Sequence, residues 1–209
     1  MAKESKVRFG IKKVHYALWD DTNETYGELV AFPGAVSWSQ TREGGDSSDF
    51  YADDGVYYTF AGTNGGYSAD LEMAFLPDSV RRDLLGEIVD DTTGVQFEVT
   101  DAEPKQFAIL FETSGDSATT GFVFYNCKAS RPEMNANTKT DSPDVDTTTL
   151  NIRIASQDFK LGNDTHSFVQ GHIDKIDANV SKYAAFFDAV SIPTASGGSG
   201  DSGSTVVSA

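Results

Sequence analysis

The segment YSADLEMAF, residues 67–75, decides the fold class because apolar side chains recur at every second position. The apolar series is Tyr67, Ala69, Leu71, Met73 and Phe75, with Ser68, Asp70 and Glu72 between them. This period of two predicts a β-strand that lays one face against a core. The 209-residue chain is long enough to bury a sizeable core, and its 14 Phe and 8 Tyr among many Thr and Ser favour β structure.

Other segments repeat or modify this pattern. VQFEV (95–99) and LNIRI (150–154) alternate in the same way. QFAILFE (106–112) and GFVFYNC (121–127) are apolar on both faces, which predicts central strands covered on two sides, or a second face covered by another subunit. Further strands are expected over residues 12–19, 27–32, 35–39 and 56–61.

Two helices are expected in this mainly β chain. After Pro77, Asp78 is predicted to cap a helix over about residues 79–89. Its apolar stripe comprises Val80, Leu84, Leu85 and Ile88. One or two further turns are predicted in NVSKYAAFFDAV (179–190), where Tyr183, Phe186, Phe187 and Val190 have helical spacing.

Long polar segments separate these elements. TREGGDSSDFYADDG (41–55) and RPEMNANTKTDSPDVD (131–146) exceed the usual hairpin loop of roughly 2 to 5 residues, and such loops are commonly functional. The final ASGGSGDSGSTVVSA is a Gly/Ser-rich tail that cannot form a core. We therefore expect one β domain over residues 1–192 and a tail over residues 193–209.

Charge and cysteine content exclude several classes of protein. The net charge of −16, from 16 basic and 32 acidic side chains, argues against stable nucleic-acid binding but allows a surface past which a polyanion slides. Cys127 is the only cysteine, so no internal disulfide can form, and its strand setting predicts a core residue. No apolar run of about 18 residues or signal peptide is present, so we expect folding in a cytoplasm.

No constellation of catalytic, cofactor-binding or metal-binding residues is evident, so we expect a protein that is not an enzyme. DSPDVD (141–146) lacks the Gly and closing Glu of a calcium loop. DDG (53–55) is predicted to be a tight turn in which Gly55 supplies the positive φ, and AGTNGGY (61–67) a hairpin turn. The three histidines show no zinc motif, although two of them are six residues apart and are predicted to share one side of a strand. They are His15, His166 and His172.

The order of parts resembles the major tail protein of long-tailed, non-contractile bacteriophages, the subunit of the tail tube. The resemblance covers about residues 6–190 and is strongest in FGIKKVHYA, LEMAFLPDSVRRDLLG and TKTDSPDVDTTTLNIRI. It implies a β-sandwich or partly closed barrel with one flanking α-helix, and six subunits in each ring of a stacked tube that delivers DNA. The implied partners are further copies of the chain, the tape-measure protein, the tail terminator and distal tail or baseplate proteins, with DNA as a transient passenger and no membrane. The implied location is the virion, after assembly in the host cytoplasm.

The resemblance also assigns candidate contact residues. The early loop would reach the neighbouring ring, and its candidates are Thr41, Arg42, Glu43, Asp46, Asp49, Phe50, Tyr51, Asp53 and Asp54. The later loop would contact another subunit through Arg131, Glu133, Lys139, Asp141, Asp144 and Asp146. Acids lining the bore would keep DNA from sticking, and the candidates on strands are Asp70, Glu72 and Glu98, beside Gln96.

Two other interpretations of the function remain. A carbohydrate- or ligand-binding β-sandwich would use exposed aromatics, and Tyr51, Tyr57 and Tyr58 are the candidates for stacking on sugars. The strand periodicity of these tyrosines favours a role as strand and interface residues. A tube protein of a bacterial secretion or contractile injection machine would share the ring arrangement.

Overall fold

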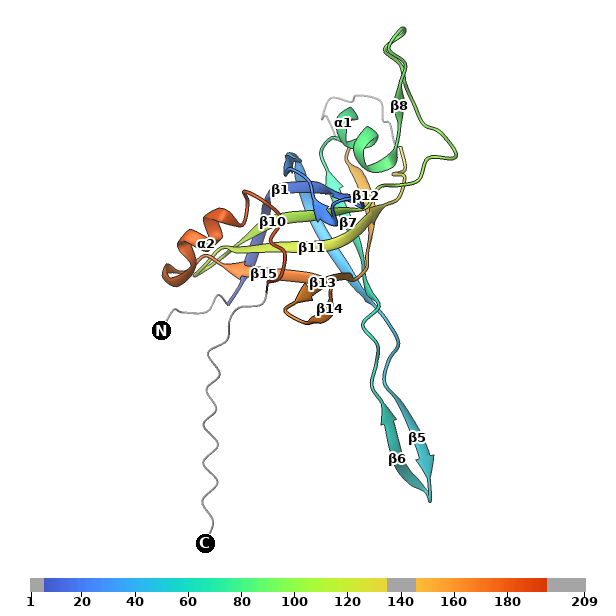
Figure 1. Cartoon of the computed structure of the whole chain (residues 1–209), viewed down its shortest axis with the longest axis vertical. Coiled ribbons are helices and arrows are strands. Elements are labelled where there is room, and N and C mark those ends of the chain that lie inside the picture. Colours follow the sequence, from blue (N-terminus) through green and yellow to red (C-terminus); the bar gives the residue numbers. More distant parts are fainter. Residues whose placement is uncertain (1–5, 135–145, 195–209) are drawn as a thin grey trace, which may run out of the picture.

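Two neighbouring strands, β10 (Phe107–Gly115) and β11 (Thr120–Ala129), form the centre of the fold. The computed structural model describes residues 6–134 and 146–194, in which the chain is mainly β and every strand pair is antiparallel. The main sheet runs in the order β2–β1–β10–β11–β12–β7–β4, with β3 beside β1 and β15 beside β11 (Figure 1). The bounds are β1 Arg8–Asp20, β2 Thr25–Tyr26, β3 Val30–Ala31, β4 Ala35–Glu43, β7 Gly66–Met73, β12 Thr148–Ile154 and β15 Gln170–Asp174.

A corner in β11 turns this sheet into two layers. The first half of β11 pairs with β15, and its last three residues, from Cys127 on, pair with β12. Between these two stretches Asn126 has a φ of 47°, and the pairing with β10 shifts register. This irregularity is a β-bulge, which bends a strand. The bend lets β12, β7 and β4 lie across one face of β1, β10 and β11, which is consistent with the expected β-sandwich.

The first core fills the space between the two layers. Trp38 of β4 reaches across it, with its ring centroid 5.0 Å from that of Phe111 and 5.2 Å from that of Phe124. The segments α1 (Asp78–Val80) and η1 (Arg81–Leu85) close one end of this core with Val80, Leu84 and Leu85. The Tyr16 hydroxyl donates a 2.6 Å hydrogen bond to Asp83 and ties this helical segment to β1.

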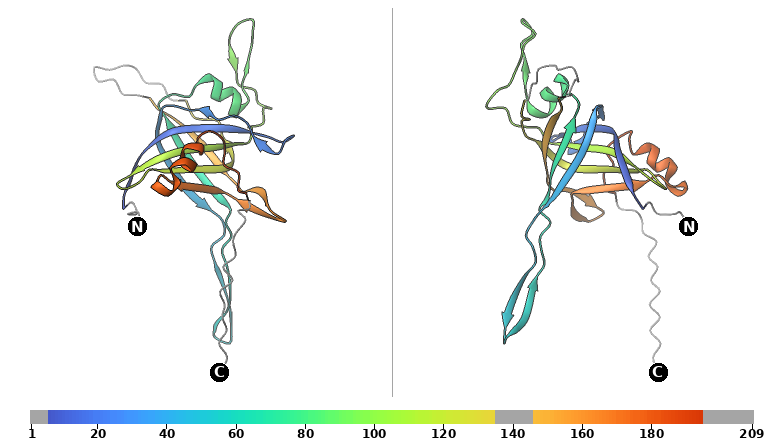
Figure 2. Two further views of the ribbon diagram at one scale, coloured as in Figure 1. Left: turned by 60° about the vertical axis from the view of Figure 1, so that its left-hand side comes forward. Right: turned by 180° about the vertical axis from the view of Figure 1, so that it is seen from behind.

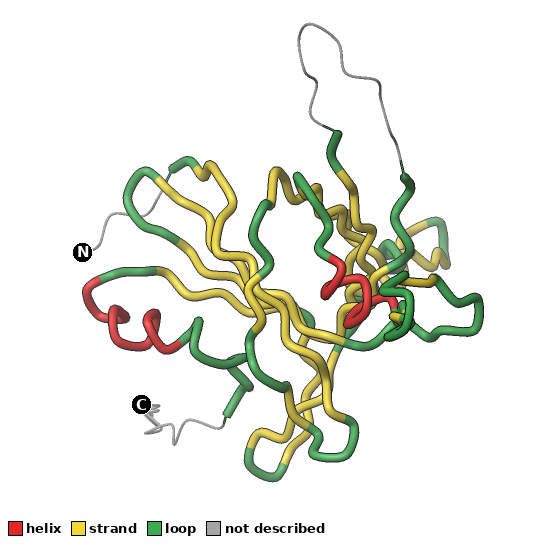
Figure 3. Tube along the Cα trace, turned by 90° about the horizontal axis from the view of Figure 1, so that it is seen from above, coloured by secondary structure: helices red, strands yellow, loops and turns green. Residues whose placement is uncertain are grey.

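The second core covers the opposite face of β10 and β11. Its cover consists of the hairpin of β13 (Gln157–Leu161) and β14 (Asp164–Phe168), and of η2 (Asp177–Asn179) with α2 (Val180–Ala185). Phe159, Phe186 and Val190 lie in this core with Leu110 and Tyr125 of the central strands. Both faces of the central strands are therefore covered within one chain. Figure 3 shows the two helical regions at opposite sides of the body.

The strands predicted from periodicity are mostly confirmed. Ala69, Leu71 and Met73 of the opening segment are buried, as are Leu150, Ile152 and Ile154 of β12, and Cys127 is a core residue. The prediction of a core-facing strand is wrong for VQFEV, where Val95 and Phe97 are both exposed, and the burial of the opening segment stops before Phe75, which is also exposed. Only Gln96–Phe97 of the VQFEV segment forms a strand, β9, which pairs with β8 (Ile88–Val89) in a short hairpin.

The predicted helix over residues 79–89 is shorter than expected. It ends at Leu85 because Gly86 adopts a φ of 75°, the left-handed conformation that terminates helices. Ile88 therefore does not join the apolar stripe, and it is 58% exposed on β8. Asp78 does not cap the helix either, since the residue at the N-cap is Pro77 and no side chain makes a capping hydrogen bond.

A buried carboxylate joins β1, β10 and the helix α2. Glu112 is 3% exposed, accepts a 2.6 Å hydrogen bond from the Tyr183 hydroxyl, and lies 3.6 Å from Lys12 Nζ and 3.2 Å from Lys13 Nζ. Burial would raise the pKa of Glu112, but the hydrogen bonds from Tyr183 and Lys13 and the charges of both lysines outweigh it and lower the pKa below its ordinary value of 4.5. The folded state therefore favours the charged form of this carboxyl.

Glu112→Gln tests this connection through the pH dependence of stability. A lowered pKa contributes stability above the ordinary pKa, and this contribution is lost as the pH falls through the folded-state value. We expect the substitution to reduce the free energy of unfolding by about 1 to 3 kcal/mol at pH 7, and the loss to shrink below pH 4.5. Urea unfolding at a series of pH values measures this loss. Tyr183→Phe is the control variant, because it removes the hydrogen bond to Glu112 but keeps the charge of the carboxylate. A loss independent of pH would show that the charge of Glu112 does not contribute.

Candidate functional site

A long β-hairpin, which we call the arm, projects from the body as a continuation of β4 and β7. It consists of residues 44–65 and contains β5 (Ser48–Ala52) and β6 (Gly55–Phe60). Figures 1 and 2 show it standing clear of the rest of the chain from three directions. The early segment predicted as a loop is thus an extended hairpin. Its two-residue turn is made by Asp53 and Asp54, with φ of 52° and 59°, so the positive φ predicted for Gly55 belongs to these aspartates.

The arm carries six large apolar side chains that no other described part of the chain covers. Their exposed fractions run from 54% for Phe50 to 73% for Tyr57, and the full set is Phe50, Tyr51, Val56, Tyr57, Tyr58 and Phe60. The rings contact one another, with 5.0 Å between the centroids of Tyr58 and Phe60. An isolated two-stranded hairpin is marginally stable in water, and a contiguous exposed apolar patch marks an interaction site. The arm is therefore the candidate functional site.

The neck of the arm brings two strands of backbone very close together. The Thr63 amide donates a 3.1 Å hydrogen bond to the Gly45 carbonyl. A Cβ on Gly44 would lie 2.0 Å from the Thr63 carbonyl oxygen, and one on Gly62 would lie 2.5 Å from that of Gly45. Glycine is required here because any side chain would separate the strands. The AGTNGGY segment is accordingly one side of this neck and not the predicted hairpin turn.

The early contact candidates divide between the sheet and the arm. Thr41, Arg42 and Glu43 belong to β4, while Asp46, Asp49, Phe50, Tyr51, Asp53 and Asp54 lie on the arm. Arg42 lies 3.7 Å from Asp46 in an exposed ion pair, and Asp49 accepts a 2.6 Å hydrogen bond from Thr59. These polar contacts organise the arm locally, whereas its aromatic residues remain available for contact.

The later contact candidates are only partly described. Lys139, Asp141 and Asp144 lie outside the described residues, and with them most of DSPDVD. Arg131 lies 3.0 Å from Glu98 in an ion pair and also donates to the Val99 carbonyl. Glu133 and Asp146 are exposed.

Two of the three predicted bore acids lie together on the outward face of β7. Asp70 accepts a hydrogen bond from Asn151, and Glu72 accepts hydrogen bonds of 2.8 Å from Ser37 and from Thr147. Hydrogen bonds from Thr147 and Ser37 lower the pKa of Glu72. Glu98 is not on this face, because it lies beside Arg131 in the segment after β9.

The face around Asp70 and Glu72, which we call the polar face, extends over β4, β7 and β12. Cross-strand register places Ser37, Ser39, Thr41, Ser68, Thr149, Asn151 and Arg153 on it with the two acids. Arg153 lies 2.6 Å from Glu43, so part of the acidity is neutralised. Arg153 was not predicted as a site residue, although its place in LNIRI, on the opposite face from the buried isoleucines, was a usable signal.

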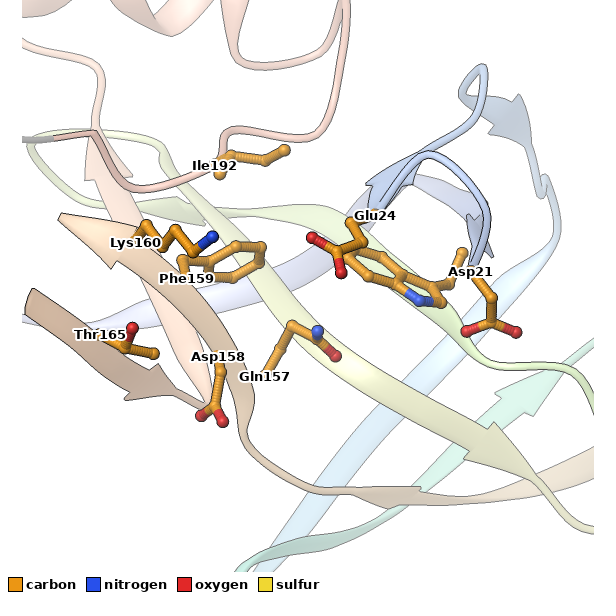
Figure 4. A pocket seen from close by; sticks show the side chains of 9 residues that line it. Asp21, Glu24, Gln157, Asp158, Phe159, Lys160, Thr165 and Ile192 are labelled. Carbon is orange, nitrogen blue, oxygen red and sulfur yellow. The ribbon is translucent and has the colours of Figure 1, made fainter. Parts of the chain in front are cut away.

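An open pocket of about 580 Å³ lies beside the second core. Figure 4 shows Asp21 and Glu24 on one side and Asp158, Phe159 and Lys160 on the other. Phe159 is 6% exposed and belongs to the second core, so its ring is not offered to a ligand. The predicted sugar-stacking tyrosines are elsewhere, on the projecting arm, and the pocket at the neck is lined by other residues, among them Arg42 and Tyr67.

The described residues contain no group of three or more His, Cys, Asp or Glu side chains that could hold a metal ion. His166 and His172 do not share a strand as predicted, because His166 is on β14 and His172 on β15. His15 Nδ1 donates a 2.8 Å hydrogen bond to the Lys13 carbonyl. Among these residues, no helix has the length and apolar character needed to cross a membrane.

Gly66→Ala tests the close packing where the arm joins the body. Gly66 has a φ of 91°, and a Cβ there would lie 2.0 Å from the Ile154 carbonyl oxygen. Gly94→Ala is the matched control, since Gly94 has a φ of 70° but open space around it. We expect about 1 kcal/mol of destabilisation for the control and about 3 kcal/mol or more for Gly66→Ala, measured by urea unfolding. Equal losses would show that the close approach is not maintained.

No protein-family model matches the chain, and no curated protein matches it in sequence.

Proposed function

We propose that this chain is a structural subunit of a tube of the phage tail-tube class, built from stacked six-membered rings. The observation that carries the proposal is the aromatic arm, which projects from a body whose two cores are complete without it. A hairpin that exposes six large apolar side chains costs solubility unless a neighbour covers them. Contact with a subunit of the adjacent ring provides that cover.

The sheet supports lateral joining within a ring. Among the strands that the structure describes, β4 pairs only with β7, so one edge of this nine-residue strand is open. Open edges promote association with another strand, and a closed ring removes them. The polar face lies on the same strands, so a barrel closed through β4 would line its bore with Ser, Thr and Asn side chains, with Asp70 and Glu72, and with Arg153.

The charge of the chain suits a bore that conducts DNA without binding it. A net charge of −16 opposes phosphate binding, and Asp70 and Glu72 add carboxylates to the proposed lining. DNA is then a transient passenger, and the protein partners are further copies, a tape-measure protein, a terminator and distal tail proteins. The virion is the proposed location, after assembly in the host cytoplasm.

Replacement of the arm tests the proposal. Gly45 and Thr63 are hydrogen-bonded across the neck, so an Asn-Gly turn in place of residues 46–62 should close the sheet without disturbing either core. We expect the full chain to form rings or tubes of uniform width in negative-stain electron microscopy at high concentration, and the shortened chain to form no tubes. Thermal unfolding of the shortened chain controls for its fold. A full chain that remains monomeric at its highest soluble concentration contradicts the proposal.

A further inference from the structure

The molecule has a second exposed apolar surface, at the opposite end from the arm. The hairpin of β8 and β9 places Ile88 directly opposite Phe97, and Val95 lies two residues before Phe97, next to the start of β9. These three side chains are 47% to 58% exposed, and we call them the upper surface. Figures 1 and 2 show this hairpin and the arm projecting from opposite ends of the long axis.

One face of the arm has a matching set of three side chains. Phe50 pairs across the arm with Tyr58, and Phe60 follows two residues later on the same strand, which places the three on one face. The register shifts directly after Phe50, and its ring also contacts that of Tyr57, with 6.5 Å between centroids. The rings of Tyr58 and Phe60 are in edge contact. Each set is a flat group of three apolar side chains on a two-stranded hairpin, and neither contributes to a core.

We infer that the upper surface of one copy is the docking site for the arm of the next copy along the tube; this inference rests on the proposed function. The two surfaces differ and lie at opposite ends of one chain, so their contact is head-to-tail. A head-to-tail contact repeats without closing, which is the geometry of a filament or a stack. A partner of another kind would cover one surface and leave the other exposed.

The exposed apolar area of the two surfaces limits how strongly a single arm can bind. Aromatic side chains bury about 150 to 250 Å² each, so the three half-exposed ones of the arm offer roughly 300 Å², and the upper surface, with one aromatic among its three side chains, offers less. A stable pair of proteins buries about 800 Å² per partner. One arm is therefore too small to hold two chains together, and rings are held when several arms dock at once.

Both hairpins are acidic, with Asp49, Asp53 and Asp54 on the arm and Asp90 and Asp91 between β8 and β9. These like charges repel each other across the contact, and salt screens the repulsion, so added salt should strengthen the contact.

Disulfide trapping between two variants tests the docking site. One full-length chain carries Tyr58→Cys and the other carries Phe97→Cys, and the native Cys127 can stay because it is fully buried. Under mild oxidation, a mixture of the two should give a cross-linked dimer joining one chain of each kind. A chain carrying both substitutions should give a ladder of oligomers. The control mixture pairs Tyr58→Cys with Val180→Cys, which is 48% exposed but lies on α2, and it should not cross-link.

Two alanine variants of exposed phenylalanines provide a second measurement. Phe97→Ala should raise the concentration needed for tube assembly roughly tenfold or more, whereas Phe75→Ala, which is 68% exposed outside the upper surface, should leave it unchanged. Tubes that form normally without the Tyr58 to Phe97 cross-link would overturn this inference and leave the proposed function standing. Absence of rings and tubes from the unmodified chain, together with no cross-link, would overturn both.

Discussion

The pairing of β10 with β11 is the constraint on which the rest of the structure depends. Because these strands are apolar on both faces, each face needs its own cover, and the chain supplies two different ones. The bulge at Asn126 allows the sheet to fold over one face, while α2 and the β13–β14 hairpin cover the other. With both cores complete, the two projecting hairpins are free to serve other contacts.

Periodicity predicted the buried strands of the fold more completely than the exposed ones. It identified β7 and β12 from alternation and the two central strands from apolar character on both faces, because burial selects those residues. The described side chains of the arm join neither core, and only its second strand, β6, was predicted as a strand, over residues 56–61. Its first strand, β5, lies in the segment 41–55 that was predicted as a polar loop. The contact residues proposed on the arm stay a prediction, and the pairing that presents Phe50 with Tyr58 and Phe60 came only from the structure.

The sequence pattern also did not predict where the backbone departs from regular strand or helix geometry. Lys12 and Lys13 are adjacent, and a regular strand would send them to opposite faces. The register of β1 shifts on both sides of Lys12, and Lys13 has a φ of 53°, so both ammonium groups approach Glu112. Gly86 ended the helix early for a similar local reason. Such features depend on single φ values that hydrophobic pattern does not report.

The negative charge of the chain opposes association between copies, whereas its exposed apolar hairpins favour it. This balance suits ordered assembly. A chain with a charge of −16 repels its copies at long range, and this repulsion opposes indiscriminate contact between the apolar hairpins. In the proposed tube, each hairpin contact would be too small to overcome the repulsion alone, whereas copies joined in a ring would present several contacts together. Lateral joining through the open edge of β4 would then have to precede stacking, and stacking would be cooperative because each docked arm brings its neighbours into register.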